Sequence, residues 1–378
     1  MYTFLNKILI VASVLVGLNS CNNSKSDFSK SDLEGAQHLI GVSFSKQNLD
    51  TIYPYLKRNR EGYDSLRTRA IPNEVMPAIR FEPIPQNFAL RSQATEPVWA
   101  ISDSIALPSI RAELAFYSIP KLASLIKTRK ITAVELTEFF IERIKKHDSV
   151  LQSTITITES RALEQAKILD EELENGRYRG ILHGIPYGVK DLMAVEGYKT
   201  TWGAEPYKNQ ELNVTATVVK KLQEAGGVLI AKLVSGSLAR GDVWFGGKTK
   251  NPWDIEEGAS GSSAGSGSAT SAGLVPFALG TETLGSITSP STKTGITGLR
   301  PTYGQVSRHG VMSLSWSMDK VGPMARSAED CAIVYSIIKG VDPNDLTTTN
   351  YPFGFDPKKD FRNLRVGYLK EDIENDST

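Results

Sequence analysis

A run of very small residues, Gly258 to Gly273, constrains this chain more than any other feature. It reads GASGSSAGSGSATSAG and contains only Gly, Ala, Ser and Thr. Segments rich in Gly and Ser often form solvated linkers. Here, however, the apolar strand pattern LVPFALG begins directly after the run, whereas a linker would have solvated flanks. Small side chains allow backbones to approach closely. We therefore predict a loop and a helix packed in the interior of the protein.

Length and charge limit the classes of protein that the chain can belong to. Its 378 residues are enough for one large α/β domain or two smaller ones. The formal net charge is only +1, so there is no extended basic surface for a phosphate backbone and we expect no nucleic-acid partner. Because 40% of the residues are hydrophobic, the composition also excludes a disordered chain.

The N-terminus carries the pattern of an export signal. The apolar run from Ile8 to Leu18 is too short to span a membrane, and its flanks suit a secretory signal. The residues LNSC, ending at Cys21, resemble a bacterial lipobox, in which the cysteine is acylated. We expect residues 1–20 to be a lipoprotein-type signal peptide and Cys21 to anchor an exported protein to a membrane of the cell envelope. A soluble protein with an apolar leader, or an uncleaved anchor, is the alternative.

The rest of the chain divides into a polar and extended part and a domain with sharp periodicity. Residues 21–108 are predicted to form a tether, a helical segment and a Pro-rich connector, which carries six prolines between residues 71 and 108. In residues 109–378, helical patterns alternate with short apolar strands such as VLIAKL and LVPFALG. Thr132 and Glu135 have capping-box spacing at the start of one such helix. This alternation predicts an α/β domain with a largely parallel or mixed sheet.

Three residues form a possible catalytic constellation: Lys190, Ser262 and Ser286. A serine needs a base to become a nucleophile. None of the four histidines has a sequence setting that marks it as that base. An uncharged lysine can take this role, and Lys190 follows the apolar residues IPYGV, which favour its burial. The alternative is a surface lysine paired with its neighbour Asp191.

The segment TETLGS, which ends at Ser286, is predicted to form a turn. Successive backbone N–H groups of such a turn can point into one concavity and hold an oxyanion. Taken alone, a serine after a glycine is more often an ordinary turn residue. Cys331 lies in an apolar helical pattern after Ser327, and we expect it to be a small buried side chain. If Cys21 is lipidated, these two cysteines form no disulfide.

Taken together, these segments resemble the amidase signature family. Three blocks follow the order and spacing of that family: LHGIPYGVKDL, NPWDIEEGASGSSAGSGSATSAGLVPFALGTETLGS, and GLRPTYGQVSRHGV with DKVGPMARSAEDC. The likeness extends from about Ser118 to Asp342. It implies an α/β fold with a mixed central β-sheet covered by helices on both faces, preceded here by an N-terminal helical and extended segment. It also implies hydrolysis of a carbon–nitrogen amide bond in a small carboxamide or peptide-like substrate.

The resemblance also assigns roles to residues. It implies that Ser286 is the nucleophile, that Ser262 is a bridging serine after a cis peptide bond, and that Lys190 is the neutral base. The backbone N–H groups expected to form the oxyanion hole are those of Thr283, Leu284, Gly285 and Ser286. No metal and no organic cofactor is implied.

The chain departs from the family pattern at several places. Leu284 stands where the family usually has glycine, Thr288 where it has arginine, and SGSSAG where it has GGSSGG. The sequence stops soon after the apolar segment NLRVGYL, whereas family members continue well beyond it. We therefore expect a truncated member that lacks its C-terminal part.

Three other functions compete with this prediction. In an α/β-hydrolase esterase, Ser263 of GSSAG would be the nucleophile, but that motif needs a strand immediately before it, and DIEEGAS is turn-like. The A subunit of a glutamyl/aspartyl-tRNA amidotransferase, which hydrolyses glutamine, shares the family's core, but the export signal argues against it. The third alternative is a truncated, inactive protein of the envelope.

Overall fold

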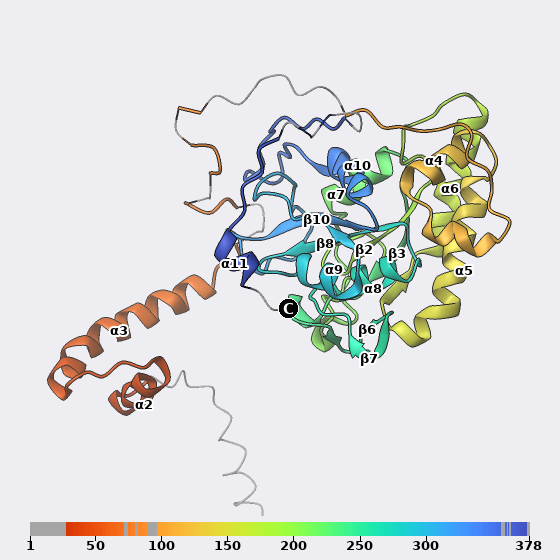
Figure 1. The fold of residues 1–378 in the computed structure, drawn as a ribbon. Coiled ribbons are helices and arrows are strands. Elements are labelled where there is room, and N and C mark those ends of the chain that lie inside the picture. The colour runs from red at the N-terminus through yellow and green to blue at the C-terminus, as the bar shows by residue number, and fades with distance from the viewer. Residues whose placement is uncertain are drawn as a thin grey trace, which may run out of the picture. The chain divides into compact units, whose positions relative to one another are not determined.

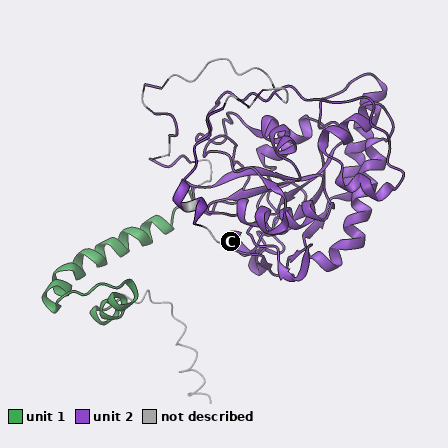
Figure 2. Cartoon of the chain, in the orientation of Figure 1, with its two compact units in different colours: residues 1–71 green, residues 72–378 purple. Residues whose placement is uncertain are grey.

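The chain divides into two compact units, residues 1–71 and residues 72–378 (Figure 2). A computed structural model describes residues 28–71, 75–79, 82–85, 87–88, 97–356, 360, 362 and 364–375. The expected signal peptide and the lipidation of Cys21 therefore lie outside the described residues. The two units are described separately below.

The first unit contains two helices, α2 (Lys30–Ile40) and α3 (Lys46–Arg67). Ser29 and Asp32 form a capping box at the start of α2, and Gly41, with φ +70°, ends it. The predicted helical character of this segment is confirmed. None of the helices in the described ranges combines the length and the apolar character needed to cross a membrane.

The second unit is built on a six-stranded sheet with the order β1-β3-β2-β8-β10-β9. Strands β3, β2 and β8 run parallel, whereas the β1–β3, β8–β10 and β10–β9 pairs are antiparallel. The predicted mixed sheet is thus confirmed. The strands of this sheet are β1 (Thr154–Ile157), β2 (Pro186–Lys190), β3 (Val228–Leu233), β8 (Phe277–Glu282), β9 (Thr297–Gly298) and β10 (Lys320–Ala325).

Helices cover both faces of this sheet, as the family resemblance implies. In Figure 1, α7 and α10 lie above the strands, and α8 and α9 lie below them. The helices of the unit are α4 (Ile119–Lys127), α5 (Ala133–Leu151), α6 (Glu159–Glu174), α7 (Thr217–Glu224), α8 (Ala264–Ser271), α9 (Thr288–Thr294), α10 (Ala328–Ile338) and α11 (Lys370–Glu374). Short 3-10 helices and two small hairpins complete the unit: η2 (Arg111–Phe116), η3 (Glu205–Tyr207), η4 (Ser237–Ala239), β4 (Val243–Trp244), β5 (Gly247–Lys248), β6 (Lys250–Asn251) and β7 (Asp254–Gly258).

Local sequence signals account for the start of α5. The Thr132 side chain accepts a hydrogen bond from the Glu135 N–H, and the Glu135 carboxylate accepts one from the Thr132 N–H. This confirms the predicted capping box, which satisfies two donors that a helix start would otherwise leave unpaired. One face of α5 is buried, as its apolar periodicity requires.

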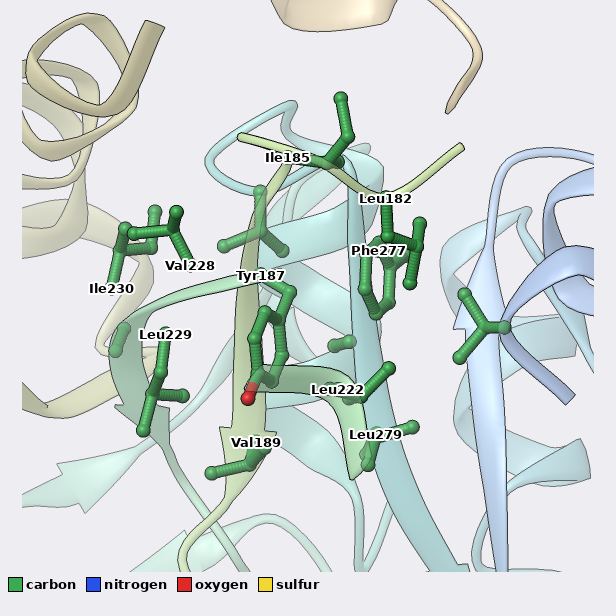
Figure 3. Close-up of a cluster of buried hydrophobic side chains, with 14 of the residues drawn as sticks. Leu182, Ile185, Tyr187, Val189, Leu222, Val228, Leu229, Ile230, Phe277 and Leu279 are labelled. Atoms are coloured by element: carbon green, nitrogen blue, oxygen red, sulfur yellow. The ribbon is translucent and has the colours of Figure 1, made fainter. Parts of the chain in front are cut away.

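The core lies where the parallel strands meet the covering helices. Strands β2, β3 and β8 are buried along their whole length, which fits strands covered on both faces. Tyr187 of β2 and Phe277 of β8 stack with ring centroids 5.3 Å apart (Figure 3). Such a pair adds about 0.5–1.5 kcal/mol to the free energy gained from apolar burial. It therefore helps to fix β2 beside β8.

The longest described part of the Pro-rich connector, residues 97–108, belongs to the second unit and contains no helix or strand. The Val98 N–H donates to the Phe355 carbonyl oxygen, and the Trp99 ring stacks on the Phe355 ring at 5.0 Å. Ile101 and Ile105 pack against the buried core. This extended segment is thus held on the domain by contacts far apart in the sequence.

The small-residue run is packed inside the domain, as predicted. Residues 264–270 of α8 are buried. A Cβ atom added to Gly265 would lie 2.2 Å from the Ser153 carbonyl oxygen, and one added to Gly261 would lie 1.9 Å from the Gly241 carbonyl oxygen. Both distances are shorter than atomic contacts allow. The residues are small because neighbouring backbone occupies the space that larger side chains would need.

Candidate active site

The site begins where two parallel strands end side by side. Gly188 of β2 pairs with Ala278 of β8, and Val189 pairs with Leu279. Since the strands run in the same direction, their carboxyl ends lie at one edge of the sheet. In α/β folds this edge is where ligands usually bind. It brings Lys190, the last residue of β2, beside the end of β8.

Lys190 is fully buried. Its Nζ lies 2.7 Å from Ser262 Oγ, 2.8 Å from Thr281 Oγ1 and 3.5 Å from the Thr281 carbonyl oxygen. Burial lowers the pKa of Lys190 from its ordinary 10.5 to about 7, although the negative charges of Asp319 and Glu282 act in the opposite direction. A substantial fraction of this amine is therefore neutral near pH 7.

The neighbours of Lys190 match the hydrogen-bonding needs of a neutral amine. A neutral amine has two N–H donors and one lone pair. The Thr281 carbonyl oxygen can only accept, and the Thr281 hydroxyl can accept a second N–H. The amine is a donor to both the Ser262 and the Thr281 hydroxyl, and in its neutral form its lone pair can accept a proton from either of them. A lone pair directed at the Ser262 hydroxyl is what a base needs in order to remove its proton.

The alternative prediction, a surface Lys190 paired with Asp191, is wrong. Asp191 instead pairs with Lys232, whose Nζ lies 2.6 Å from Asp191 Oδ1, and both side chains are fully buried. The second carboxylate oxygen of Asp191 accepts hydrogen bonds from the N–H and the hydroxyl of Thr201. Within the residues that the structure describes, Lys190 thus has no carboxylate partner that would keep it protonated.

Ser262 stands directly before Ser263, the N-cap residue of α8, and its side chain is 1% exposed. The peptide bond between Gly261 and Ser262 is cis, as the family resemblance implies. The Ser262 carbonyl oxygen accepts a hydrogen bond from the Gly236 N–H at 3.0 Å. This backbone contact holds Ser262 beside the loop that follows β3.

Ser263, the nucleophile of the competing esterase prediction, has a structural role here. Its hydroxyl donates to the Thr281 carbonyl oxygen at 3.1 Å and accepts from the Thr281 N–H at 3.2 Å. The motif needs a strand that leads directly into the serine. Strand β7 ends at Gly258 and belongs to a separate two-stranded sheet. The structure therefore gives no support to the esterase alternative.

Ser286 is half-buried and is in backbone contact with Ser263, the residue that follows Ser262. Its carbonyl oxygen accepts a hydrogen bond from the Ser263 N–H at 3.2 Å, so the turn that carries Ser286 contacts the start of α8. The structure thus places the three predicted catalytic residues at one edge of the sheet. Their catalytic roles stay predictions.

Glu282 shapes the turn between β8 and Ser286, referred to below as the nucleophile turn (residues 283–286). Its carboxylate accepts hydrogen bonds from the N–H groups of Ile287 and Thr288 at 2.8 and 2.9 Å. Burial alone would raise the pKa of Glu282, but these backbone donors outweigh it and hold that pKa below its ordinary value. The Gly285 N–H is also directed to this carboxylate. The assignment of the oxyanion donors therefore stays a prediction.

Two of the departures from the family pattern lie in the nucleophile turn and at the start of the helix that follows it. Leu284 is 76% exposed, so its side chain extends away from the core. Thr288 starts α9, and its hydroxyl lies 3.2 Å from the Glu282 carboxylate. Arg300 approaches the other oxygen of Glu282 at 3.3 Å. A hollow of about 310 Å³ adjoins this region and is lined by Arg300, Pro301, Thr302, Tyr303, Ser317, Met318 and Lys320.

Two further side chains that could serve as a nucleophile or a metal ligand, Cys331 and His183, are buried. Burial raises the pKa of the Cys331 thiol to about 12, so this side chain is unreactive, and its predicted burial is confirmed. His183 is buried with Nε2 2.9 Å from the Leu169 carbonyl oxygen. Within the ranges that the structure describes, His, Cys, Asp and Glu side chains form no group of three that could hold a metal ion.

Fold and site together define a class of α/β protein in which a buried lysine contacts one serine at the carboxyl edge of a mixed sheet, and the turn that carries a second serine contacts the residue after the first. The chain belongs to the Amidase family, whose sequence pattern it matches over residues 135–378. The family predicted from the sequence blocks is thereby confirmed.

Individual relatives agree with this family. The chain is 39% identical over 270 residues to the A subunit of Glutamyl-tRNA(Gln) amidotransferase of Thermoanaerobacter pseudethanolicus, which covers 68% of this chain and 54% of the relative. It resembles the structure of peptide amidase from Stenotrophomonas maltophilia with 35% identity and a TM-score of 0.59, over 62% of this chain and 50% of that one. It also resembles the structure of the Glutamyl-tRNA(Gln) amidotransferase A subunit from Thermotoga maritima with 32% identity and a TM-score of 0.56, over 65% and 51% of the two chains. The chain spans about half the length of the curated relatives that it matches.

Two residues of the site were missed by the sequence analysis. Thr281 contacts the Lys190 amine, and Asp319 contacts the nucleophile turn. The sequence does contain a signal for Thr281. This residue stands near the end of one predicted strand, and the strand beside it ends at Lys190, the candidate base. Asp319 has no such local signal, since only the pairing of β10 with β8 brings it near.

Proposed function

We propose that this chain carries the amide-hydrolysing centre of an amidase, with Ser286 as nucleophile, Ser262 as proton relay and Lys190 as base. The observation that carries the proposal is the buried Lys190 amine, 2.7 Å from Ser262 Oγ and with a pKa lowered to about 7. A lysine with this pKa acts near neutral pH both as an acceptor and as a donor of protons.

The first step forms an acyl-enzyme. Lys190 takes the Ser262 hydroxyl proton, and Ser262 takes the Ser286 proton while Ser286 Oγ bonds to the amide carbonyl carbon. Backbone N–H groups of the nucleophile turn stabilise the oxyanion that develops on the carbonyl oxygen. As the carbon–nitrogen bond breaks, the Lys190 ammonium returns its proton through Ser262 to the leaving nitrogen. The products of this step are ammonia or an amine and an ester on Ser286.

The second step hydrolyses that ester. Water attacks the ester carbonyl carbon and gives its proton through Ser262 to Lys190. When the carbon–oxygen bond to Ser286 breaks, the same route returns a proton to Ser286 Oγ. The carboxylic acid leaves and the starting protonation states are restored. Every proton in this scheme is carried by protein groups, so the scheme requires no metal or cofactor.

The proposed substrate is a small carboxamide or peptide-like amide. The resemblance to peptide amidase supports this class. A hollow of about 310 Å³, at the lower end of the size range of ligand pockets, is lined by Arg300 and Lys320, which contact Glu282 and Thr283, but not by Lys190, Ser262 or Ser286. The export signal and the lipid anchor at Cys21 lie outside the described residues, and an envelope location is proposed from the N-terminal sequence alone.

A second candidate function is glutamine hydrolysis as the A subunit of a tRNA-dependent amidotransferase. The relatives that are A subunits of Glutamyl-tRNA(Gln) amidotransferase, at 39% identity, support it. Glutamine is itself a carboxamide, so the same catalytic groups serve both candidates. The two differ in substrate range and in the need for partner proteins.

An amide panel tests both candidates on the full chain. The panel contains small aliphatic carboxamides, C-terminal peptide amides and free glutamine, and released ammonia is measured. We expect Ser286→Ala and Lys190→Ala to abolish turnover, whereas Ser271→Ala and Lys221→Met leave it intact. Ser271 is a matched control because it lies on α8 but donates to the Thr294 carbonyl oxygen, away from the site. Unchanged turnover in both active-site variants would refute the proposal, and turnover of glutamine alone would favour the amidotransferase function.

A further inference from the structure

A single carboxylate joins the nucleophile turn to the loop that precedes β10. Asp319 is 8% exposed and stands directly before that strand. The Thr283 hydroxyl donates to Asp319 Oδ1 at 2.5 Å. On the other side, the N–H groups of Leu314 and Ser315 donate to Oδ2 at 2.7 and 3.0 Å. Both oxygens of this buried side chain are thus occupied by groups from two separate segments.

Strand pairing places Asp319 opposite the nucleophile turn. Lys320 of β10 pairs with Glu282 of β8 in antiparallel register, so the residue before Lys320 faces the residue after Glu282. The Lys320 ammonium also donates to the Thr283 carbonyl oxygen at 3.1 Å. Thr283 is therefore held through its side chain and its backbone at the point where the chain leaves β8 for Ser286.

We propose that Asp319 is a positioning residue that fixes the nucleophile turn through Thr283 and thereby sets where Ser286 meets the substrate. The proposal rests on the proposed function, since it assigns a role in the reaction of Ser286. Asp319 acts through Thr283 rather than by touching the substrate. With Asp319 included, the proposed active site draws on three strands, β2, β8 and β10, and not only on β2 and β8.

The charge of Asp319 gives this role a signature that a purely structural contact lacks. Asp319 and Glu282 are the negative groups that raise the pKa of Lys190 against the effect of burial. The cations nearby are Lys320 and Arg300, which also act on each other, and Arg308, which is paired with Asp345. A small cavity of about 10 Å³ is lined by Thr281, Val311, Met312, Ser313, Val321 and the side chains of Arg308, Asp319 and Lys320. Removal of the Asp319 charge should therefore lower the pKa of Lys190.

Asp319→Asn is thus expected to affect the reaction rate in two ways, one that raises it and one that lowers it. The lower pKa of Lys190 makes more of the amine neutral at pH 7, which by itself would favour reaction. Loss of the charged acceptor for Thr283 misplaces the turn and slows the reaction. Hydrogen bonds to a charged group are strong enough for about a tenfold loss or more. A slower reaction whose pH midpoint moves to lower pH therefore identifies this role.

The test is labelling of Ser286 by a fluorophosphonate probe, which needs no knowledge of the substrate. The second-order rate constant is measured from about pH 5 to 10 on the full chain, with the labelled serine identified by mass spectrometry. The variants are Asp319→Asn, Thr283→Val, which removes the hydroxyl but keeps the charge, and the control Asp330→Asn. Asp330 is also buried, and it accepts a hydrogen bond from the Ile119 N–H at 2.8 Å on a different helix, α10.

We expect Asp319→Asn to label about tenfold more slowly, with a midpoint lower by about 0.5 to 1 pH unit. Thr283→Val should also label more slowly, with an unchanged midpoint, and Asp330→Asn should match the wild type in both. A wild-type rate in either Asp319→Asn or Thr283→Val overturns the role of Asp319 while the proposed function stands. If Asp319→Asn does not fold, the rate of Thr283→Val decides. A wild-type chain that is not labelled at Ser286 overturns the proposed function and this role with it.

Discussion

The replacement Lys190→Met should stabilise the folded chain, and by an amount that depends on pH. Met has nearly the length of the lysine stem and carries no charge, so it removes the cost of holding an ammonium group in a buried place. The pKa of Lys190 falls from 10.5 to about 7 on folding. At about 1.36 kcal/mol for each pH unit, this difference corresponds to a cost of roughly 5 kcal/mol.

The sign and the pH range of the effect follow from proton linkage. Below about pH 7 the lysine is charged in both states, and the full cost lowers the free energy of unfolding. Between about pH 7 and 10.5 the folded state has lost its proton while the unfolded state retains it, so the wild type gains stability as pH rises. The advantage of Lys190→Met should therefore shrink by roughly 2.5 to 3 kcal/mol from about pH 6 to pH 9. Loss of the contacts with Ser262 and Thr281 changes the size of the advantage but not this pH dependence.

Equilibrium urea unfolding of both proteins at a series of pH values measures this difference. Lys220→Met is the control, because Lys220 is exposed on α7 and its replacement should shift stability equally at every pH. Parallel stability curves for wild type and Lys190→Met would refute the reasoning. Such a result would mean that the amine keeps its ordinary proton affinity, and a charged lysine is not a base.

Three more predictions concern the support of the site. In a thermal melt, Gly265→Ala should prevent folding or lower the melting temperature sharply, because the new Cβ would lie 2.2 Å from a backbone oxygen. The control Gly62→Ala has open space around the new Cβ and should leave the melting temperature unchanged or raise it. Lys232→Met should lower the free energy of unfolding, measured in urea, by about 3–5 kcal/mol, because it leaves Asp191 buried and unpaired. Adding Asp191→Asn to the same chain should restore part of this free energy. Thr281→Val should slow fluorophosphonate labelling about tenfold without unfolding the chain, and a wild-type rate would show that this hydroxyl does not orient the amine.

Much of the fold could be predicted from local sequence patterns. The capping box at Thr132 and the apolar strands are short-range signals, and the structure confirms them. The interior position of the small-residue run followed from its flanks, because a core strand begins directly after Gly273. Burial of Lys190 could be anticipated in the same way, since its stem leaves an apolar strand. Each of these features is determined by residues close to it in the chain.

The partners of the buried charges could not be predicted in this way. Lys190 is the last residue of β2 and Asp191 begins the turn after it, so their adjacency in the sequence does not decide whether their side chains pair. Asp191 meets Lys232 instead, because β3 lies beside β2 with Lys232 next to Val189. The contact of Asp319 with Thr283 depends likewise on the register of β10 against β8. Which strands are neighbours, and in what register, is decided by packing of the whole sheet.

The position of β10 has a consequence for the nascent protein. The groups gathered at the sheet edge are spread from residue 190 to residue 319, and β8 lies between β2 and β10 in the sheet. While the ribosome is still adding residues before Lys320, the serine-bearing turn lacks one of its two flanking strands. Reactivity toward a serine-directed probe should therefore arise late in translation and in a single step, once β10 has emerged and paired.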